Sequence, residues 1–425
     1  MYSITGSIIF LIIAFNVFFP KILLIGSHFY LYEPFLALLS ILFLANYRTN
    51  NVYIHNIVVI YFIYLFVLLV SSIISFLFSG VIEFRSFFKI IRYFYIFFIF
   101  FIAFQIGSFI NEIRLKKILF YNFIFVFLWL IYLLYHYYNN PLPDIVYYTW
   151  TYAKEYRFIG LTGKAFDLRN FQIVNVGNTS VQMGVFTALF SSIFLSLYFN
   201  SKKNLFYLFC LFLFVIATIM TFSRSGFLIL LIIFLTFFNQ FKNKRVFKIY
   251  LIIFSLILLF FLNDSFFNFI NSFGVLGKIF ITADLQDESS STRLDYWLRA
   301  FNLLKENPFL LISGVGFGDY SSYKFIKTPH LESLFFTTLF QSGILGFLFL
   351  TFFFLTIYKS MIIYLNNNES KSIYYNILYG LYKFYPGFIL ANLLGGDSLH
   401  SDFISPVFFG LLGICFKNLK YNNNL

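Results

Sequence analysis

The chain has 425 residues, of which 60% are hydrophobic and only 11% charged, with 69 phenylalanines and 32 tyrosines. Soluble domains carry roughly a quarter charged residues, so this composition excludes a soluble protein and indicates an all-α integral membrane protein. The net charge of +13 does not indicate a nucleic-acid partner, because the basic residues lie between apolar stretches and not in one basic domain.

Apolar stretches predict about twelve transmembrane helices in one polytopic domain over residues 1–425. The expected spans are Ile8–Ile25, Leu31–Ala45, Ile54–Phe78, Phe87–Ile106, Ile118–Tyr137, Ser180–Phe199, Leu205–Thr221, Gly226–Phe241, Phe247–Phe261, Leu331–Tyr364, Ile373–Leu394 and Phe403–Phe416. The first lacks the basic segment and cleavage site of a secretory signal, so we interpret it as a retained span, although Pro20 and Lys21 interrupt it. Leu331–Tyr364 is too long for one simple crossing, and Gly343 and Gly346 predict a break within it.

The charges of the short loops predict the orientation. Basic residues gather on one side of this threading: Arg48, Arg114, Lys116, Lys117, Lys202, Lys203, Lys242, Lys244, Arg245, Lys248, Lys359, Lys371, Lys417 and Lys420. That side is expected to be cytoplasmic, with both chain termini. Most acidic residues fall on the other side, including Glu83, Asp144, Asp264, Asp287, Asp319 and Asp397. The two cysteines lie in apolar spans and indicate neither a disulfide framework nor a metal site.

Two long connections are expected on the extracytoplasmic side, Asn139–Gly177 and, between spans 9 and 10, Asn263–Pro329. Loops of this length are usually functional or disordered, and these are rich in Arg, Asp, Gly and aromatic residues. In the second loop, Leu294, Trp297, Leu298, Phe301 and Leu304 have helical spacing, so an amphipathic helix is expected from Ser291 to Asn307–Pro308.

Arginines are the first candidate site residues. Arg224 lies in TFSRSGFLIL, and splitting this tract at Thr221–Gly226 places it in a tight outer turn between two spans. It either anchors a helix end or binds an anion, and the positive-inside bias disfavours an arginine there without a function. Arg157, in YRFIGLTG, is either solvated or functional, and Asn178 lies at the entry to the next span, where it would cap a helix.

The large outer loop supplies the other candidates. Arg293 and Trp297 are one helical turn apart, so they either form an anion- and sugar-binding pair or serve as a water-facing charge and a headgroup anchor. The glycines of GVGFG, with Gly316 and Gly318, would let the backbone pass close to a ligand or reverse sharply.

A histidine is the candidate base. Thr328–Pro329 is expected to open the next helix, so His330 would lie in its first turn, where the macrodipole keeps the imidazole neutral. A surface histidine without a role is the alternative. Glu332 is two positions further on and faces another direction.

In order and topology, these motifs resemble the O-antigen polymerase and O-antigen ligase superfamily of bacterial polysaccharide assembly. The resemblance covers Arg157 to Gly346 through YRFIG, GN, SRSG, RLDYW with NP, GVGFG, PH and SGILG. This family usually has Asn after the histidine, where this chain has Leu331. The resemblance implies an inverting, membrane-embedded glycosyltransferase whose donor is a polyprenyl (undecaprenyl) diphosphate-linked glycan. It further implies that Arg157, Arg224 and Arg293 hold the diphosphate without a metal or other cofactor, and that His330 is the base.

The resulting expectation is a polymerase of lipid-linked repeat units for O-antigen or capsular polysaccharide, at the outer face of the bacterial inner membrane. Its partners would be the lipid-linked glycan, membrane lipid, a chain-length regulator and a flippase. One alternative is an O-antigen ligase, whose acceptor is the lipid A core. The other is a flippase of the same glycan, which should carry mid-membrane charges, and Lys383 is the clearest of these in the sequence.

Overall fold

Helices dominate the computed structural model of this chain, and four short strands accompany them. The structure describes residues 2–15, 21–24, 27–30, 36, 38–40, 52–79, 84–139, 164–167, 172–175, 180–200, 205–221, 223–237, 288–306, 308–316, 333–368, 372–394, 399 and 404–419. The helices are α1 (Tyr2–Phe15), α3 (Val52–Ser79), α4 (Phe84–Ile106), η2 (Gly107–Phe109), α5 (Glu112–Asn139), α7 (Ser180–Asn200), α8 (Leu205–Met220), α9 (Arg224–Phe237), α13 (Glu288–Glu306), α14 (Pro308–Ser313), α15 (Leu334–Asn366), α16 (Ile373–Leu394) and α17 (Ile404–Asn418). The strands are β1 (Lys21–Leu24), β2 (Ser27–Tyr30), β3 (Lys164–Asp167) and β4 (Gln172–Asn175).

Five of the described helices are long and apolar enough to cross a membrane: segments of α3, α4, α7, α15 and α16. Three shorter apolar helices, α8, α9 and α17, pack among them. The protein is therefore a helical membrane protein, as the composition indicates. The predicted span Phe247–Phe261 and most of Leu31–Ala45 lie outside the described residues.

The first predicted span, Ile8–Ile25, is wrong in its second half. The helix α1 ends at Phe15, and Lys21–Leu24 forms strand β1, which pairs with β2 and, in parallel, with β3. Proline has no amide hydrogen to donate and disfavours helix in the residue before it, so Pro20 separates the helix from the strand. The sheet has the order β2-β1-β3-β4, which joins the N-terminal segment to the first long loop.

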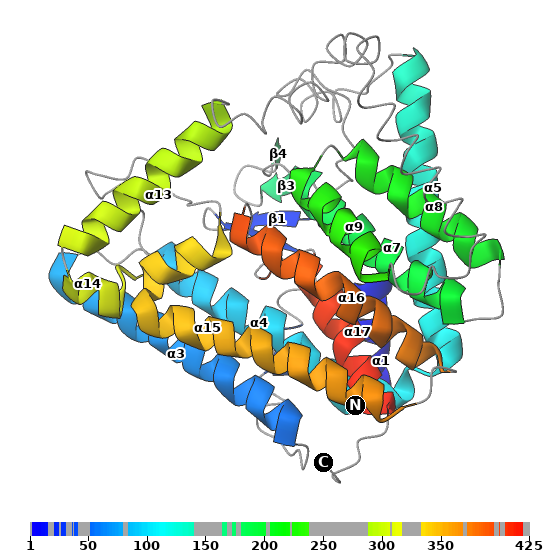
Figure 1. Cartoon of the computed structure of the whole chain (residues 1–425), viewed down its shortest axis with the longest axis horizontal. Coiled ribbons are helices and arrows are strands. Elements are labelled where there is room, and N and C mark those ends of the chain that lie inside the picture. The colour runs from blue at the N-terminus through cyan, green and yellow to red at the C-terminus, as the bar shows by residue number, and fades with distance from the viewer. Residues whose placement is uncertain are drawn as a thin grey trace.

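At the centre of the bundle, α7 packs against α8, α9 and α16, while α15 lies along α3 and α17 along α4 (Figure 1). Serine supports this packing, since the Ser192 hydroxyl donates to the carbonyl of Gly380 at 2.7 Å. A Cβ on Gly380 would lie 2.7 Å from the Cα of Ile193, so α7 and α16 cross with their backbones nearly in contact.

One end of the bundle is basic. Here Asn418, the last residue of α17, donates to the carbonyl of Gly107 at 2.9 Å, and Tyr374, at the start of α16, donates to that of Ile110 at 3.0 Å. The helix α5 starts beside them, with Arg114, Lys116 and Lys117 in its first two turns. We call this the basic end, and the opposite end the site end.

The predicted break in the long span is confirmed. Within α15, Gly343 has φ 63° and ψ −167°, a conformation that is not helical and that essentially only glycine adopts. The break divides α15 into a short segment next to the large loop and a longer one that spans the bundle.

Candidate functional site

The helix α9 begins at Arg224 after a tight turn from α8, which ends at Met220. Ser223 caps α9, because its Oγ accepts a hydrogen bond from the amide of Gly226 at 3.2 Å and its carbonyl accepts one from Phe227 at 2.9 Å. The arginine is therefore the first residue of a helix and not a charge in the middle of one, as the split of the apolar tract predicted.

Two glycines set the depth at which α9 starts. A Cβ on Gly226 would lie 2.8 Å from the Cα of Gly184, in the first turns of α7, and a Cβ on Gly184 would lie 2.6 Å from the Cβ of Ser223. Real Cβ atoms do not come this close to backbone, so only glycine lets the starts of α7 and α9 touch. The glycine of SRSG, Gly226, is therefore required for packing, and its contact with Gly184 fixes the position of Arg224.

Buried hydroxyl groups hold the α8–α9 turn rigid. Thr218 donates to the hydroxyl of Thr187 on α7 at 2.9 Å, Thr221 donates to the carbonyl of Thr218 at 2.6 Å, and the amide of Ser223 donates to Thr221 at 3.3 Å. All four side chains are buried. Because buried polar groups cost free energy unless they are paired, this chain of hydrogen bonds favours one conformation of the turn.

The place of Arg224 on α9 is electrostatically unusual. A helix N-terminus carries a partial positive charge that attracts anions and disfavours cations, by roughly 0.3–1 kcal/mol at exposed sites. An arginine at the first helical position adds to this positive potential, and α9 has no acidic residue in its first turn. The combination is suited to an anion, since phosphate groups bind readily at helix N-termini.

The end of α16 and the start of α15 lie at the same end of the bundle. Ile229 of α9 lies against Gly387, and Thr236 against Lys383, so α9 and α16 run antiparallel and the start of α9 is beside the end of α16. There, Ser333 donates to the carbonyl of Leu393 at 2.7 Å. The starts of α9 and α15 therefore both adjoin the end of α16.

The helix α15 begins later than Thr328–Pro329, the start that the sequence predicted. Ser333 is the N-cap, with an extended backbone and an Oγ that accepts from the amide of Phe336 at 3.4 Å, and α15 begins at Leu334. A serine that caps the helix and also donates to α16 defines the start better than Thr328–Pro329 does. His330 lies outside the described residues, so the effect of a helix dipole on its ring stays a prediction.

The predicted amphipathic helix is present as α13, but its buried face differs from the prediction. Leu304 and Ala300 are buried, whereas Leu298 and Phe301 are 57% and 56% exposed. Trp297 stacks on Phe336, in the first turn of α15, with ring centroids 4.5 Å apart. One face of the indole thus packs against protein and attaches α13 to α15. Arg299, two positions further on, pairs with Asp295 at 2.6 Å.

The glycines after α14 cover the break in α15. Gly314 and Gly316 have φ of 73° and 75°, and the amides of Val315 and Gly316 donate to the carbonyls of Phe340 and Gln341 at 2.9 and 2.8 Å. Those carbonyls would accept from residues 344 and 345 in a continuous helix, and the break at Gly343 removes these partners. The close approach that the structure shows for these glycines is to the backbone of α15, and the predicted approach to a ligand stays a prediction.

Among the described residues, no contact brings the remaining predicted site residues together. Arg157, Asn178, Gly318, His330 and Glu332 lie outside the described residues. For Arg224 and Arg293 the structure describes the backbone alone, on α9 and α13.

The sequence analysis missed three cations on α4. Arg85, Lys89 and Arg92 are four and three positions apart and so share one face of the helix. The 23 residues of α4 span about 34 Å, and its last residue adjoins η2 at the basic end, so the three cations lie toward the site end. The signal was their spacing of four and three in an otherwise apolar helix.

Lys383, the mid-span charge, has structural partners. Its Nζ donates to the carbonyl of Thr236 at 2.9 Å and lies 5.2–5.8 Å from the ring centroids of Tyr379, Tyr382 and Phe237. Because α9 ends at Phe237, that carbonyl lacks a helical partner, and a cation is favourable at a helix C-terminus. The lysine therefore caps α9.

Replacing Lys383 by methionine should lower the thermal unfolding temperature by a few degrees, because the cap and the cation–π contacts are lost. Glycan assembly, the activity that the sequence resemblance implies, should per folded molecule stay within about twofold of the unchanged chain. Circular dichroism melting and an assembly assay in membranes check the two parts, with Lys359→Met as an exposed control. Full stability with loss of assembly would instead indicate a charge-carrying role, as in a transporter.

Comparison with known proteins places the site elements in a family. Residues 209–351 match the family model described as O-Antigen ligase. This segment contains most of α8, all of α9, α13 and α14, and the first half of α15 with its break. No curated protein and no solved structure gives a significant match. Over this central segment, about a third of its length, the chain is similar to the O-antigen ligase family, as the resemblance of its motifs indicates.

Proposed function

We propose that this protein polymerises polyprenyl diphosphate-linked oligosaccharide repeats into O-antigen or capsular polysaccharide at the outer face of the bacterial cytoplasmic membrane. In this proposal about twelve helices cross the membrane, the large loop between spans 9 and 10 is extracytoplasmic, and both termini are cytoplasmic. The basic end then faces the cytoplasm and the site end faces outward, in agreement with the positive-inside rule.

The observation that carries the proposal is the position of Arg224 at the start of α9. The arginine and the amides of the first helical turn form a positive site at one end of the bundle, and the contact between Gly184 and Gly226 fixes its place. A glycosyl diphosphate donor develops negative charge on its leaving group as the anomeric bond breaks. A planar guanidinium binds phosphate oxygens in a bidentate manner, so it can stabilise that charge without a metal.

The reaction requires one bond to form and one to break. A hydroxyl oxygen of the acceptor sugar bonds to the anomeric carbon of the donor glycan, and the diphosphate leaves from the opposite face with the electron pair, which inverts the anomeric centre. A base accepts the hydroxyl proton, and His330 is the candidate because the resemblance assigns it this role. Arg157 and Arg293 would share the charge of the diphosphate with Arg224.

The other predicted residues would position the glycan. The exposed face of Trp297 would stack on a sugar ring while its other face rests on Phe336. Asn178, Gly316, Gly318 and Glu332 would contact the substrate from the loops that join α7, α14 and α15. Partners would include membrane lipid, a chain-length regulator and a flippase.

The cations of α4 favour polymerisation over ligation. A polymerase must hold two lipid diphosphates at once, those of the growing donor and of the acceptor repeat, whereas a ligase acceptor is the lipid A core. Arg85, Lys89 and Arg92 supply a second group of cations at the site end, on a different helix from Arg224. We assign them to the diphosphate of the acceptor. The similarity of residues 209–351 to the O-Antigen ligase family supports the alternative of ligation.

Replacing both Arg85 and Lys89 by alanine should reduce chain growth roughly tenfold at low repeat concentration, because charged hydrogen bonds to the acceptor diphosphate are lost. Excess lipid-linked repeat should restore the rate, since these residues bind and do not react. Initial rates over a concentration series check this. A fall in the maximal rate that excess repeat does not relieve would contradict the assignment. Lys305→Gln with Lys359→Gln is the matched control, since both lysines lie outside this group.

The acceptor that the protein requires distinguishes a polymerase from a ligase. The purified protein is incubated with lipid-linked repeat alone, or together with lipid A core, and the products are resolved by size. A ladder of lipid-linked chains without the core is expected for a polymerase. Product formation only in the presence of the core would show ligation instead.

A further inference from the structure

A pocket at the basic end lies far from the candidate site. It has a volume of about 380 Å³ and is lined by Ile113, Lys116, Lys117, Leu119, Phe120 and Phe123 of α5, Phe194 of α7, and Phe206 and Tyr207 of α8. This volume lies within the range of roughly 300–1,000 Å³ that is usual for small-molecule sites. The pocket is open at the side of the bundle between α5 and α8, so a ligand can enter it from the surrounding lipid.

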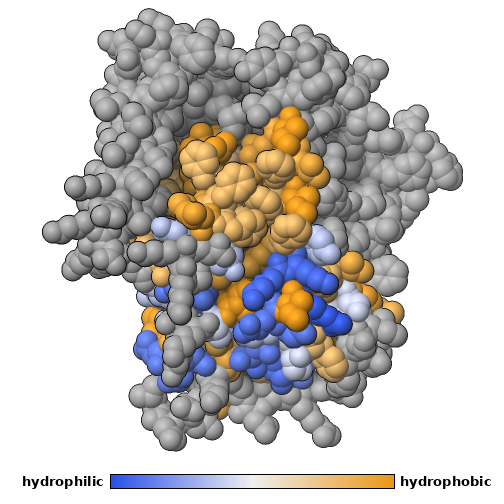
Figure 2. Space-filling model, turned by 90° about the vertical axis from the view of Figure 1, so that its right-hand side faces the viewer, coloured by the Kyte–Doolittle hydropathy of each residue, from blue (hydrophilic) through white to orange (hydrophobic). Residues whose placement is uncertain are grey.

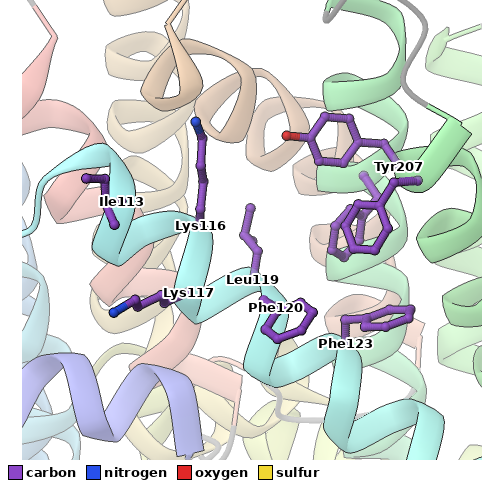
Figure 3. A pocket seen from close by; sticks show the side chains of 9 residues that line it. Ile113, Lys116, Lys117, Leu119, Phe120, Phe123 and Tyr207 are labelled. Carbon is purple, nitrogen blue, oxygen red and sulfur yellow. The ribbon is translucent and has the colours of Figure 1, made fainter.

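The pocket has a polar and an apolar part. Figure 3 shows the amino group of Lys116 and the hydroxyl of Tyr207 at one side, and the rings of Phe120 and Phe123 at the other. The apolar part is built from aromatic contacts across the two helices, with Phe123 5.6 Å from Phe206 between ring centroids. Phe120 and Phe206 remain 46% and 43% exposed, so their rings are available to a further apolar group.

The polar and apolar parts of the pocket lie at different distances from the basic end of the bundle. Lys116 and Lys117 lie in the second turn of α5, next to the basic end, whereas Phe120 and Phe123 are one to two turns deeper. Figure 2 shows the side of the molecule on the right of Figure 1, where hydrophobic residues form a patch that adjoins a group of hydrophilic ones. The pocket therefore matches a molecule with a polar head at the membrane surface and an apolar chain.

The charge of the polar part is positive. The helix α5 has one acidic residue, Glu112, and three residues that are positively charged at neutral pH: Arg114, Lys116 and Lys117. Arg114 donates to the carbonyl of Phe109 at 2.9 Å, and among the described residues no ion pair or hydrogen bond engages the amino group of either lysine. Both lysines are exposed. The amino group of Lys116 lies on the side of the Tyr207 hydroxyl and that of Lys117 points away from it (Figure 3), so Lys116 can contact an anionic headgroup and Lys117 adds to the positive potential.

We propose that this pocket binds an anionic glycerophospholipid of the leaflet at the basic end, with its phosphate at Lys116, in the positive potential to which Lys117 adds, and an acyl chain against Phe120, Phe123 and Phe206. The site is separate from the candidate glycan site, which lies at the other end of the bundle. Bound lipid would fill the gap between α5 and α8 and stabilise the packing of α8, which precedes the turn at Arg224.

Native mass spectrometry of the full-length protein tests this, with phosphatidylglycerol and phosphatidylcholine of identical acyl chains as the probes. The natural chain should retain phosphatidylglycerol in preference to phosphatidylcholine. Lys116→Gln with Lys117→Gln should weaken this preference about fivefold for each lysine removed. Lys305→Gln with Lys359→Gln removes the same charge from exposed positions elsewhere and should leave the preference unchanged.

A second variant tests the apolar part and keeps both lysines. Ile113→Trp places a large ring at the rim of the pocket and should reduce retention of both lipids. Thermal unfolding of each variant establishes that it is folded. Equal retention of the two lipids by the natural chain would overturn the proposal, as would a preference that persists in the double lysine variant, because either result indicates lipid bound elsewhere on the surface.

Discussion

Replacing Arg224 by alanine should reduce chain growth by about 10²–10³-fold, the usual effect of removing one preorganised group that stabilises developing charge. The folded protein should be as stable as the unchanged chain or slightly more stable, because a cation at the first position of α9 opposes the helix dipole. Lipid-linked single repeats should still reach the outer face. Chain growth is measured in membranes, and stability by thermal unfolding of the purified variant.

Lysine at the same position separates the two interpretations of this arginine. An arginine that only anchors a helix end is replaced well by lysine, which snorkels in the same way. A bidentate contact with a diphosphate is not replaced, because the ammonium is a point charge without the planar fork. Arg224→Lys should therefore lose about tenfold in chain growth. Full activity in the lysine variant, or loss of stability in the alanine variant, would support the anchor.

Replacing Gly343 by alanine should prevent the protein from folding to its native stability. An alanine at φ 63° and ψ −167° adopts a conformation that costs roughly 1–3 kcal/mol, and its Cβ would overlap the carbonyl oxygen of Ile312 and lie 2.8 Å from the amide nitrogen of Gly314. Both groups are backbone and cannot rotate away. The segment from α14 to Gly316 would separate from α15 and leave the carbonyls of Phe340 and Gln341 without partners. Fluorescence-detected size exclusion and thermal unfolding measure the loss.

Gly6→Ala is the matched control for this substitution. Gly6 is buried in α1, and a Cβ there would meet the Cβ of Phe109 at 3.5 Å, an ordinary van der Waals contact. Because alanine favours helix over glycine by about 1 kcal/mol, this variant should be at least as stable as the unchanged chain. If Gly343→Ala were equally well folded, the break in α15 would not be a structural requirement.

Several parts of the architecture could be predicted because single residues determine them. The length of the apolar stretches in the sequence identifies α3, α7 and α16, whose bounds differ from the predicted spans by at most two residues. The break at Gly343 could be predicted because a 33-residue apolar helix exceeds one crossing and glycine marks the weak point. The turn at Thr221–Gly226 followed from the cost of an arginine inside the membrane.

Other parts depend on contacts that local patterns do not contain. The sheet pairs Lys21 with Ala165, and no local signal indicates a partner that distant in sequence. The start of α15 is set by Ser333, which donates to Leu393 on α16 as well as capping its own helix. The buried side of α13 depends on where α15 lies, so helical spacing identified the helix but not the residues that pack.

The most direct measurement follows chain growth and lipid release together in detergent solution. No membrane divides the sample into two compartments there, so transport cannot contribute. Purified protein is given lipid-linked repeat without any nucleotide sugar, and both glycan length and free polyprenyl diphosphate are quantified. We expect one polyprenyl diphosphate to be released for each repeat added, with both products reduced about 10²–10³-fold by Arg224→Ala. Chain growth without release of the lipid diphosphate, or growth at the unchanged rate in the Arg224→Ala variant, would contradict transfer from a lipid diphosphate donor at this site.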